Sequence, residues 1–96
     1  MYSNIRTVLN LNEKPELILT AKDGDVVQVG FFEFVVSVKS SWSGDRMYLT
    51  RRDSIFARAE SGALDKMKYL SAPNGAITMS AKEVLGLLKT RTYNIV

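Results

Sequence analysis

The stretch that decides the fold runs from Phe31 to Arg52 and reads FFEFVVSVKSSWSGDRMYLTRR. Successive side chains of a β-strand point to opposite faces, so residues two positions apart share a face. With that period, one face of the first half carries the apolar residues Phe32, Phe34, Val36 and Val38. The other face carries Phe31, Glu33, Val35, Ser37 and Lys39. This pattern predicts a strand over residues 31–39 with one buried face.

The second half of the stretch predicts a returning strand. Turn-forming residues fill the segment Ser40–Asp45, where we expect the chain to reverse. Beyond this turn, Met47 and Leu49 continue the apolar face, whereas the opposite face carries Arg46, Tyr48, Thr50 and Arg52. The two strands are therefore expected to pair antiparallel, with cations around an aromatic ring on their polar face.

Further strands are predicted on the N-terminal side. Ile5–Leu11 alternates between apolar and polar residues, and Leu17–Thr20 is a short β-prone run. The pair Asp23-Gly24 is typical of a tight hairpin, from which Val26–Val29 would return. We expect these segments to extend the sheet.

The clearest helix signal begins at Ser80, which is followed three positions later by Glu83 as in a capping box. The predicted helix, Ser80–Thr90, has an apolar stripe formed by Ala81, Val84, Leu85 and Leu88. Gly86 costs about 1 kcal/mol relative to alanine, which favours a closely packed neighbouring backbone there. Near the end of the helix, Lys89 and Arg91 suit the negative end of its dipole.

The remaining segments are less clear. Residues 53–72 permit more than one interpretation: Ile55–Glu60 alternates like a strand, and Ala63–Leu70 fits a short helix or a strand. The tail Thr92–Val96 is β-prone and is expected to dock on the body of the protein or on a partner. Together the patterns predict one domain, 1–96, of the α+β class. A curved antiparallel sheet of four to six strands would have the C-terminal amphipathic helix packed on one face.

The amino-acid composition excludes several classes of function. The chain of 96 residues has no His and no Cys, which excludes zinc sites, thiol nucleophiles and the usual neutral-pH base. Nucleotide-binding glycine motifs are absent, so we expect no enzyme and no cofactor. Residues 46–96 hold nine Lys or Arg against four Asp or Glu, a net charge of +5, which suits a polyanionic partner. The lack of cysteine fits the cytoplasm, and no apolar run is long enough to cross a membrane.

Two parts of the chain resemble known families that bind single-stranded nucleic acid. Gly75–Ser80, running into Glu83–Leu88, resembles the last strand and helix of the positive-cofactor-four family of transcription coactivators. Phe31–Phe34 with Ser43–Thr50 is similar to the strands of purine-rich-element-binding repeats. The resemblance implies a four-strand-plus-helix unit that dimerises and holds the nucleic acid on its sheet. Residues 53–72 are longer than the link expected in that unit.

Cations and aromatic rings on the predicted hairpin supply the two ingredients of a single-strand binding surface, namely charge for phosphates and rings for base stacking. The candidate nucleic-acid-binding residues are Lys39, Trp42, Arg46, Tyr48 and Arg52, extended by Arg58, Lys66 and Lys68. The alternative interpretation of this surface is an ordinary solvated strand face.

The first functional hypothesis is therefore a non-enzymatic, homodimeric module for single-stranded DNA or RNA that acts in transcription or nucleic-acid handling. The alternative is a small protein-interaction or inhibitor domain, such as a viral or plasmid-encoded regulator. In that case exposed aromatic residues would anchor a protein partner, and the candidates are Phe31, Trp42 and Tyr93.

Overall fold

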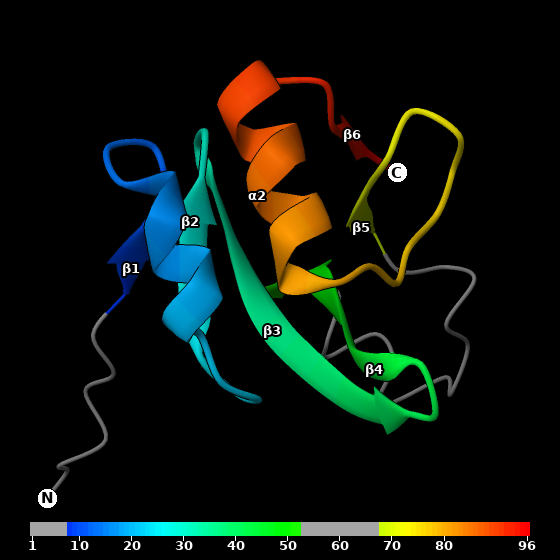
Figure 1. Ribbon diagram of the computed structural model, residues 1–96. Helices are drawn as coiled ribbons and strands as arrows, with labels where there is room; N and C mark the ends of the chain where they lie inside the picture. The colour runs from blue at the N-terminus through cyan, green and yellow to red at the C-terminus, as the bar shows by residue number, and fades with distance from the viewer. Residues whose placement is uncertain (1–7, 53–67) are drawn as a thin grey trace, which may run out of the picture.

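A six-stranded sheet forms the frame of the protein in the computed structural model, which describes residues 8–52 and 68–96 (Figure 1). The strands lie side by side in chain order: β1 Leu9–Asn10, β2 Val26–Val29, β3 Phe32–Ser41, β4 Gly44–Arg51, β5 Tyr69–Ser71 and β6 Asn94–Ile95. The described ranges also contain a 3-10 helix, η1 Pro15–Thr20, and an α-helix, α2 Ala81–Thr90. The predicted α+β class and the C-terminal helix are confirmed.

The sheet is mixed rather than wholly antiparallel. Strands β1 and β2 pair in parallel, whereas every later neighbouring pair is antiparallel. A parallel pair needs a crossover between its strands, and here η1 lies within that crossover. The prediction of a β-run over Leu17–Thr20 is therefore wrong. Pro15 suits the first turn of a helix, and Ile18 is buried in the core.

The segment Asp23-Gly24 does not form the predicted hairpin turn. It lies alongside β3 instead, where the N–H of Gly24 donates to the carbonyl of Val36 at 2.8 Å. The N–H of Val38 donates to the Asp23 carboxylate, also at 2.8 Å. The loop before β2 thus forms hydrogen bonds with backbone groups of β3 that β2 does not reach.

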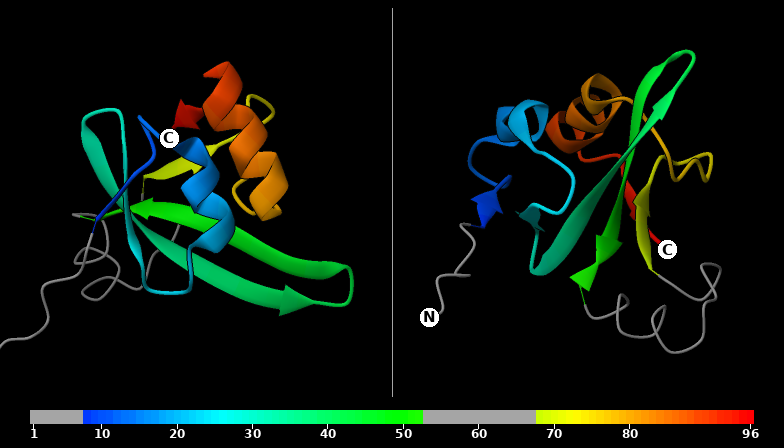
Figure 2. Two further views of the ribbon diagram at one scale, coloured as in Figure 1. Left: turned by 60° about the vertical axis from the view of Figure 1, so that its left-hand side comes forward. Right: turned by 90° about the horizontal axis from the view of Figure 1, so that it is seen from below.

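Strands β3 and β4 form the predicted antiparallel pair, and they are longer than the sequence pattern indicated. Ser41 pairs with Gly44, so the turn consists of Trp42 and Ser43 alone. Gly44 has a φ of 111°, a left-handed conformation that glycine adopts at little cost. Figure 2 shows that the end of this hairpin projects beyond the rest of the sheet. We call residues 39–46 the arm.

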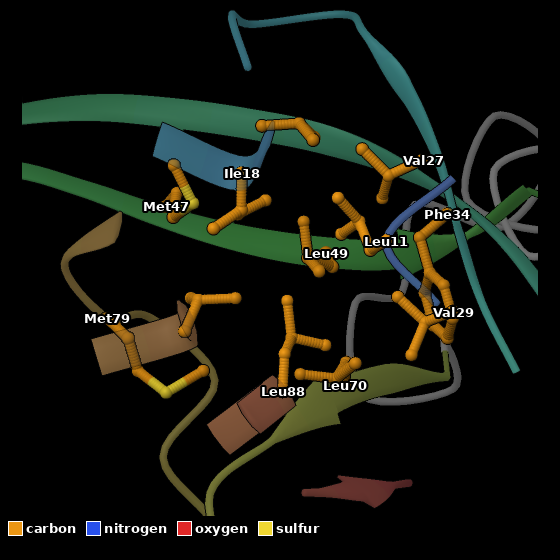
Figure 3. Packing of buried hydrophobic residues seen from close by; sticks show 12 residues of the cluster. Leu11, Ile18, Val27, Val29, Phe34, Met47, Leu49, Leu70, Met79 and Leu88 are labelled. Atoms are coloured by element: carbon orange, nitrogen blue, oxygen red, sulfur yellow. The ribbon is translucent and has the colours of Figure 1, made fainter. Parts of the chain in front are cut away.

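The core lies between the sheet and the pair of helices η1 and α2, which contact each other on one face of it (Figures 1 and 3). The predicted core residues Phe34, Val36, Met47 and Leu49 are buried, and Val38 packs against them. The sequence pattern also places Phe32 in the core, but Phe32 is 36% exposed. The ring lies at the end of the strand, 4.4 Å from the guanidinium carbon of Arg51.

Helix α2 begins as the sequence predicted. The Ser80 hydroxyl accepts a hydrogen bond from the N–H of Glu83, and the Glu83 carboxylate accepts one from the N–H of Ser80, both at 3.2 Å. The tail also docks on the body, since β6 pairs with β5. The strand expected before the helix is reduced to one bridge between Met79 and Met47. The predictions for residues 53–67 and 1–7 lie outside the described residues.

Gly86 is not closely packed, contrary to expectation. A Cβ at this exposed position would meet no atom within 4 Å. We therefore expect Gly86→Ala to raise the free energy of unfolding by about 1 kcal/mol, because alanine loses less backbone entropy in a helix. Urea denaturation monitored by circular dichroism measures this gain. A loss of stability would mean that the glycine serves a structural purpose.

Candidate binding surfaces

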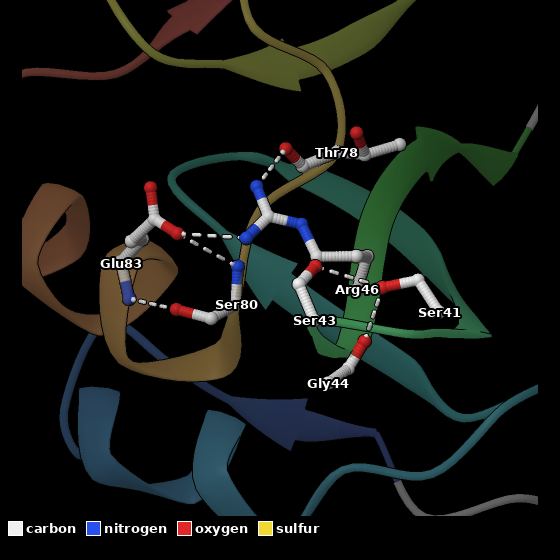
Figure 4. Close-up of polar contacts among 7 residues, drawn as sticks. All are labelled: Ser41, Ser43, Gly44, Arg46, Thr78, Ser80 and Glu83. Atoms are coloured by element: carbon white, nitrogen blue, oxygen red, sulfur yellow. Dashed lines mark hydrogen bonds and ion pairs between the residues drawn. The ribbon is translucent and has the colours of Figure 1, made fainter.

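Arg46 joins the arm to the start of α2 rather than pointing into solvent. One guanidinium nitrogen lies 3.2 Å from the carboxylate of Glu83, and the other donates to the carbonyl of Thr78 at 3.0 Å (Figure 4). Because Met47 also bridges to Met79, the chain before α2 is fastened to β4 at two successive residues. Arg46 therefore serves as a structural tie, and its charge is balanced locally.

The carboxylate of Glu83 completes both the helix cap and this tie. The hydrogen bond from the backbone N–H of Ser80 lowers the pKa of Glu83 below its ordinary value of 4.5, and the Ser80 hydroxyl and the Arg46 guanidinium act in the same direction. A group whose pKa is lower in the folded state adds stability above its unfolded pKa, and this stability is lost as the pH falls through the folded pKa. The tie is therefore expected to weaken below pH 4.5.

We expect Glu83→Gln to destabilise the protein more at pH 7 than at pH 3, because glutamine keeps the cap but lacks the charge. Urea denaturation of both proteins at the two pH values measures the difference. An equal loss at both values would contradict an ionic contribution from Glu83.

Tyr48 is buried, and so it cannot provide an open stacking face. It is only 5% exposed, and its ring meets that of Tyr69 edge to face, with centroids 5.8 Å apart. The amino group of Lys39 lies 5.5 Å from the Tyr48 centroid. The predicted role of Tyr48 in stacking is therefore wrong. This burial could not be inferred from the local pattern, because Tyr69 comes from a strand twenty-one positions further along the chain.

The other predicted cations are dispersed. Arg52 is paired with Glu33 at 2.9 Å, although both side chains are substantially exposed. Lys68 is exposed just before β5, and its carbonyl accepts a hydrogen bond from the N–H of Arg51. Arg58 and Lys66 lie outside the described residues. The structure thus does not bring the predicted cluster together as an unpaired cationic surface around an open ring.

Trp42 stands apart from every other described side chain. It is 100% exposed at the tip of the arm. The turn that carries it is held by the Ser41 hydroxyl, which donates to the Gly44 carbonyl at 2.6 Å and lies 3.1 Å from the Ser43 hydroxyl. The indole is therefore presented on an ordered turn.

A groove at the opposite end of β3 combines cations with aromatic rings. It has a volume of about 510 Å³ and opens to solvent between the loop after β1, the β2–β3 turn and the end of α2. Its described lining consists of Leu11, Asn12, Pro15, Val29, Gly30, Phe31, Leu88, Lys89, Arg91 and Tyr93. The charged members of this lining, Lys89 and Arg91, are both cations.

Phe31 is the most exposed ring of the groove, and the backbone beside it is held firmly. The residue is 99% exposed in the turn between β2 and β3, not on a strand face beside Tyr48 as predicted. The Asn12 amide donates to the Gly30 carbonyl at 3.0 Å and accepts from the Gly30 N–H at 2.7 Å. This reciprocal pair fixes Gly30 in its left-handed conformation, with φ at 61°, and so positions the next residue.

The cationic side of the groove comes from the end of α2. The Lys89 amino group lies 3.9 Å from a Glu16 carboxylate oxygen, in a pair whose side chains are both more than half exposed. Such exposed pairs contribute little, so a ligand phosphate can compete for Lys89. The sequence placed Lys89 and Arg91 at the helix end but did not indicate the groove, because its walls come from distant segments.

Comparisons with protein-family models, curated proteins and solved structures found no match to this chain. Within residues 8–52 and 68–96, no helix is long and apolar enough to span a membrane.

Proposed function

We propose that this protein is a non-enzymatic module that binds single-stranded DNA or RNA, and that the groove is its contact surface. The observation that carries the proposal is the convergence of Phe31 and Tyr93 with Lys89 and Arg91 in one open groove. Base-stacking rings beside phosphate-binding cations are the usual components of single-strand binding sites. This surface replaces the strand cluster indicated by the sequence.

The shape and charge of the groove support a nucleic-acid strand over an acidic peptide. A peptide side chain that anchors in the groove would need an enclosed pocket that removes it from water. The groove instead opens to solvent, and the Phe31 ring on its rim is almost entirely exposed. An unpaired base can stack on such an open ring. The two cations of the groove and the net charge of +3 on the chain favour a phosphate chain.

Titration of a fluorescently labelled oligothymidylate at 50 and 200 mM salt tests the proposal. Wild type should bind, with affinity falling as salt rises because bound phosphates release counterions. Lys89→Ala should bind more weakly and show a shallower salt dependence. Lys82→Ala, an exposed lysine on the same helix outside the groove, is the matched control.

The double variant Arg46→Ala/Arg52→Ala distinguishes the groove from the strand face. We expect it to keep oligonucleotide binding, since neither arginine lines the groove. Loss of binding in this folded variant, together with normal binding by Lys89→Ala, would return the site to the strand face. No binding by wild type at 50 mM salt would contradict the proposed function.

A protein partner is the second candidate, and the arm is the observation that favours it. Trp42 is fully exposed on an ordered turn, and tryptophan is a frequent anchor of protein interfaces. The arm's own charges, Lys39, Asp45 and Arg46, are close to balance once the tie to Glu83 is included, so the arm does not favour phosphates.

Trp42 is the only tryptophan, so its fluorescence reports contact with the arm. Oligonucleotide binding in the groove should leave that fluorescence unchanged.

From the family resemblance we further propose that the protein is a homodimer and acts in transcription or nucleic-acid handling. Sedimentation equilibrium over a hundredfold range of protein concentration tests the dimer. A single species with the monomer mass throughout would contradict it.

A further inference from the structure

The end of α2 has a backbone conformation that its residue does not favour. Arg91 has φ 54° and ψ 41°, and it is the one non-glycine residue with positive φ in the described ranges. Helices commonly end with a residue in this left-handed conformation, and glycine is the usual choice because it has no Cβ to clash. Here the conformation lets the Thr92 N–H donate back to the Leu87 carbonyl at 3.1 Å.

The left-handed conformation of Arg91 places this residue on the groove together with Lys89. Side chains two positions apart on a regular helix do not face the same way. Lys89 and Arg91 are two positions apart, yet both line the groove, because the helix has ended at Thr90 and the chain turns back at Arg91. The turn therefore brings a second cation to the same opening.

Arg91 also has its charge available. Among the residues that the structure describes, its guanidinium forms no ion pair with a carboxylate, whereas Lys89 lies near Glu16. A guanidinium offers several donors in a planar fork that matches phosphate oxygens. We infer that Arg91 is a phosphate-binding residue of the groove, placed there by a strained turn at which glycine would be more stable. This inference rests on the proposed nucleic-acid binding.

The variant Arg91→Gly tests the inference through two independent measurements. Removing the Cβ should raise Tm by about 4 °C, as measured by thermal denaturation. The same variant should bind oligothymidylate about tenfold more weakly, because one charge-assisted contact is lost. The slope of log affinity against log salt should become shallower by about 0.7, the value for one phosphate of a single strand.

Arg91→Lys and Lys82→Ala complete the experiment. Lysine keeps the charge, so Arg91→Lys should retain the wild-type salt slope, and Lys82→Ala should change neither slope nor affinity. If wild type and Arg91→Gly bind equally well, the inference is overturned while the proposed function stands. If wild type does not bind at 50 mM salt, the proposed function fails. A lower Tm for Arg91→Gly would overturn the claim of strain.

Discussion

Phe34→Ala is expected to lower the free energy of unfolding by about 3–5 kcal/mol, which is the usual range for a buried phenylalanine. The side chain is fully buried in the core cluster, and Figure 3 shows it beside Val29 and Leu11. Its removal would lose apolar burial and leave a cavity that the strands of the sheet cannot fill by moving closer together. A domain of this size has a total stability of about 5–15 kcal/mol, so the variant would lose much of it.

Urea denaturation monitored by circular dichroism measures this loss. Phe31→Ala is the matched control, because the same residue type lies three positions earlier and is exposed. We expect the control to unfold at the wild-type urea concentration. Equal destabilisation by the two substitutions would contradict the assignment of Phe34 to the core and Phe31 to the surface.

Phe31→Ala is expected to have its large effect on binding instead. Loss of one base–aromatic stack is worth about 1–3 kcal/mol, so the dissociation constant for oligothymidylate should rise by about five- to 150-fold. The salt slope should stay at the wild-type value, because stacking releases no counterions. This combination separates the ring of Phe31 from the cations Lys89 and Arg91, whose loss changes the slope.

Leu19→Ala provides a control for nonspecific loss of exposed apolar surface. Leu19 is an exposed large residue on η1 and does not line the groove. Its substitution should leave oligonucleotide affinity unchanged. If Leu19→Ala and Phe31→Ala weaken binding equally, or if neither does, stacking on Phe31 is contradicted.

Local patterns predicted β3, β4 and α2, but neither the crossover through η1 nor the groove that it helps to form. The alternation over β3 and β4 identified the core residues Phe34 and Leu49, and the spacing of Ser80 and Glu83 identified the start of α2. The same alternation assigned Tyr48 to a solvent-exposed face, but Tyr48 is buried in the structure. Alternation distinguishes the two faces of a strand, but it does not report what covers the second face.

The sequence by itself determined the long hairpin, the capped helix and the apolar face between them, because each depends on residues within a few positions of one another. Only the tertiary structure decided which charges are engaged and where rings and cations meet. Arg46 and Arg52 find their carboxylate partners thirty-seven and nineteen positions away. The groove likewise joins Asn12, Phe31 and Arg91, which are adjacent only after the crossover, the sheet and the helix have packed together.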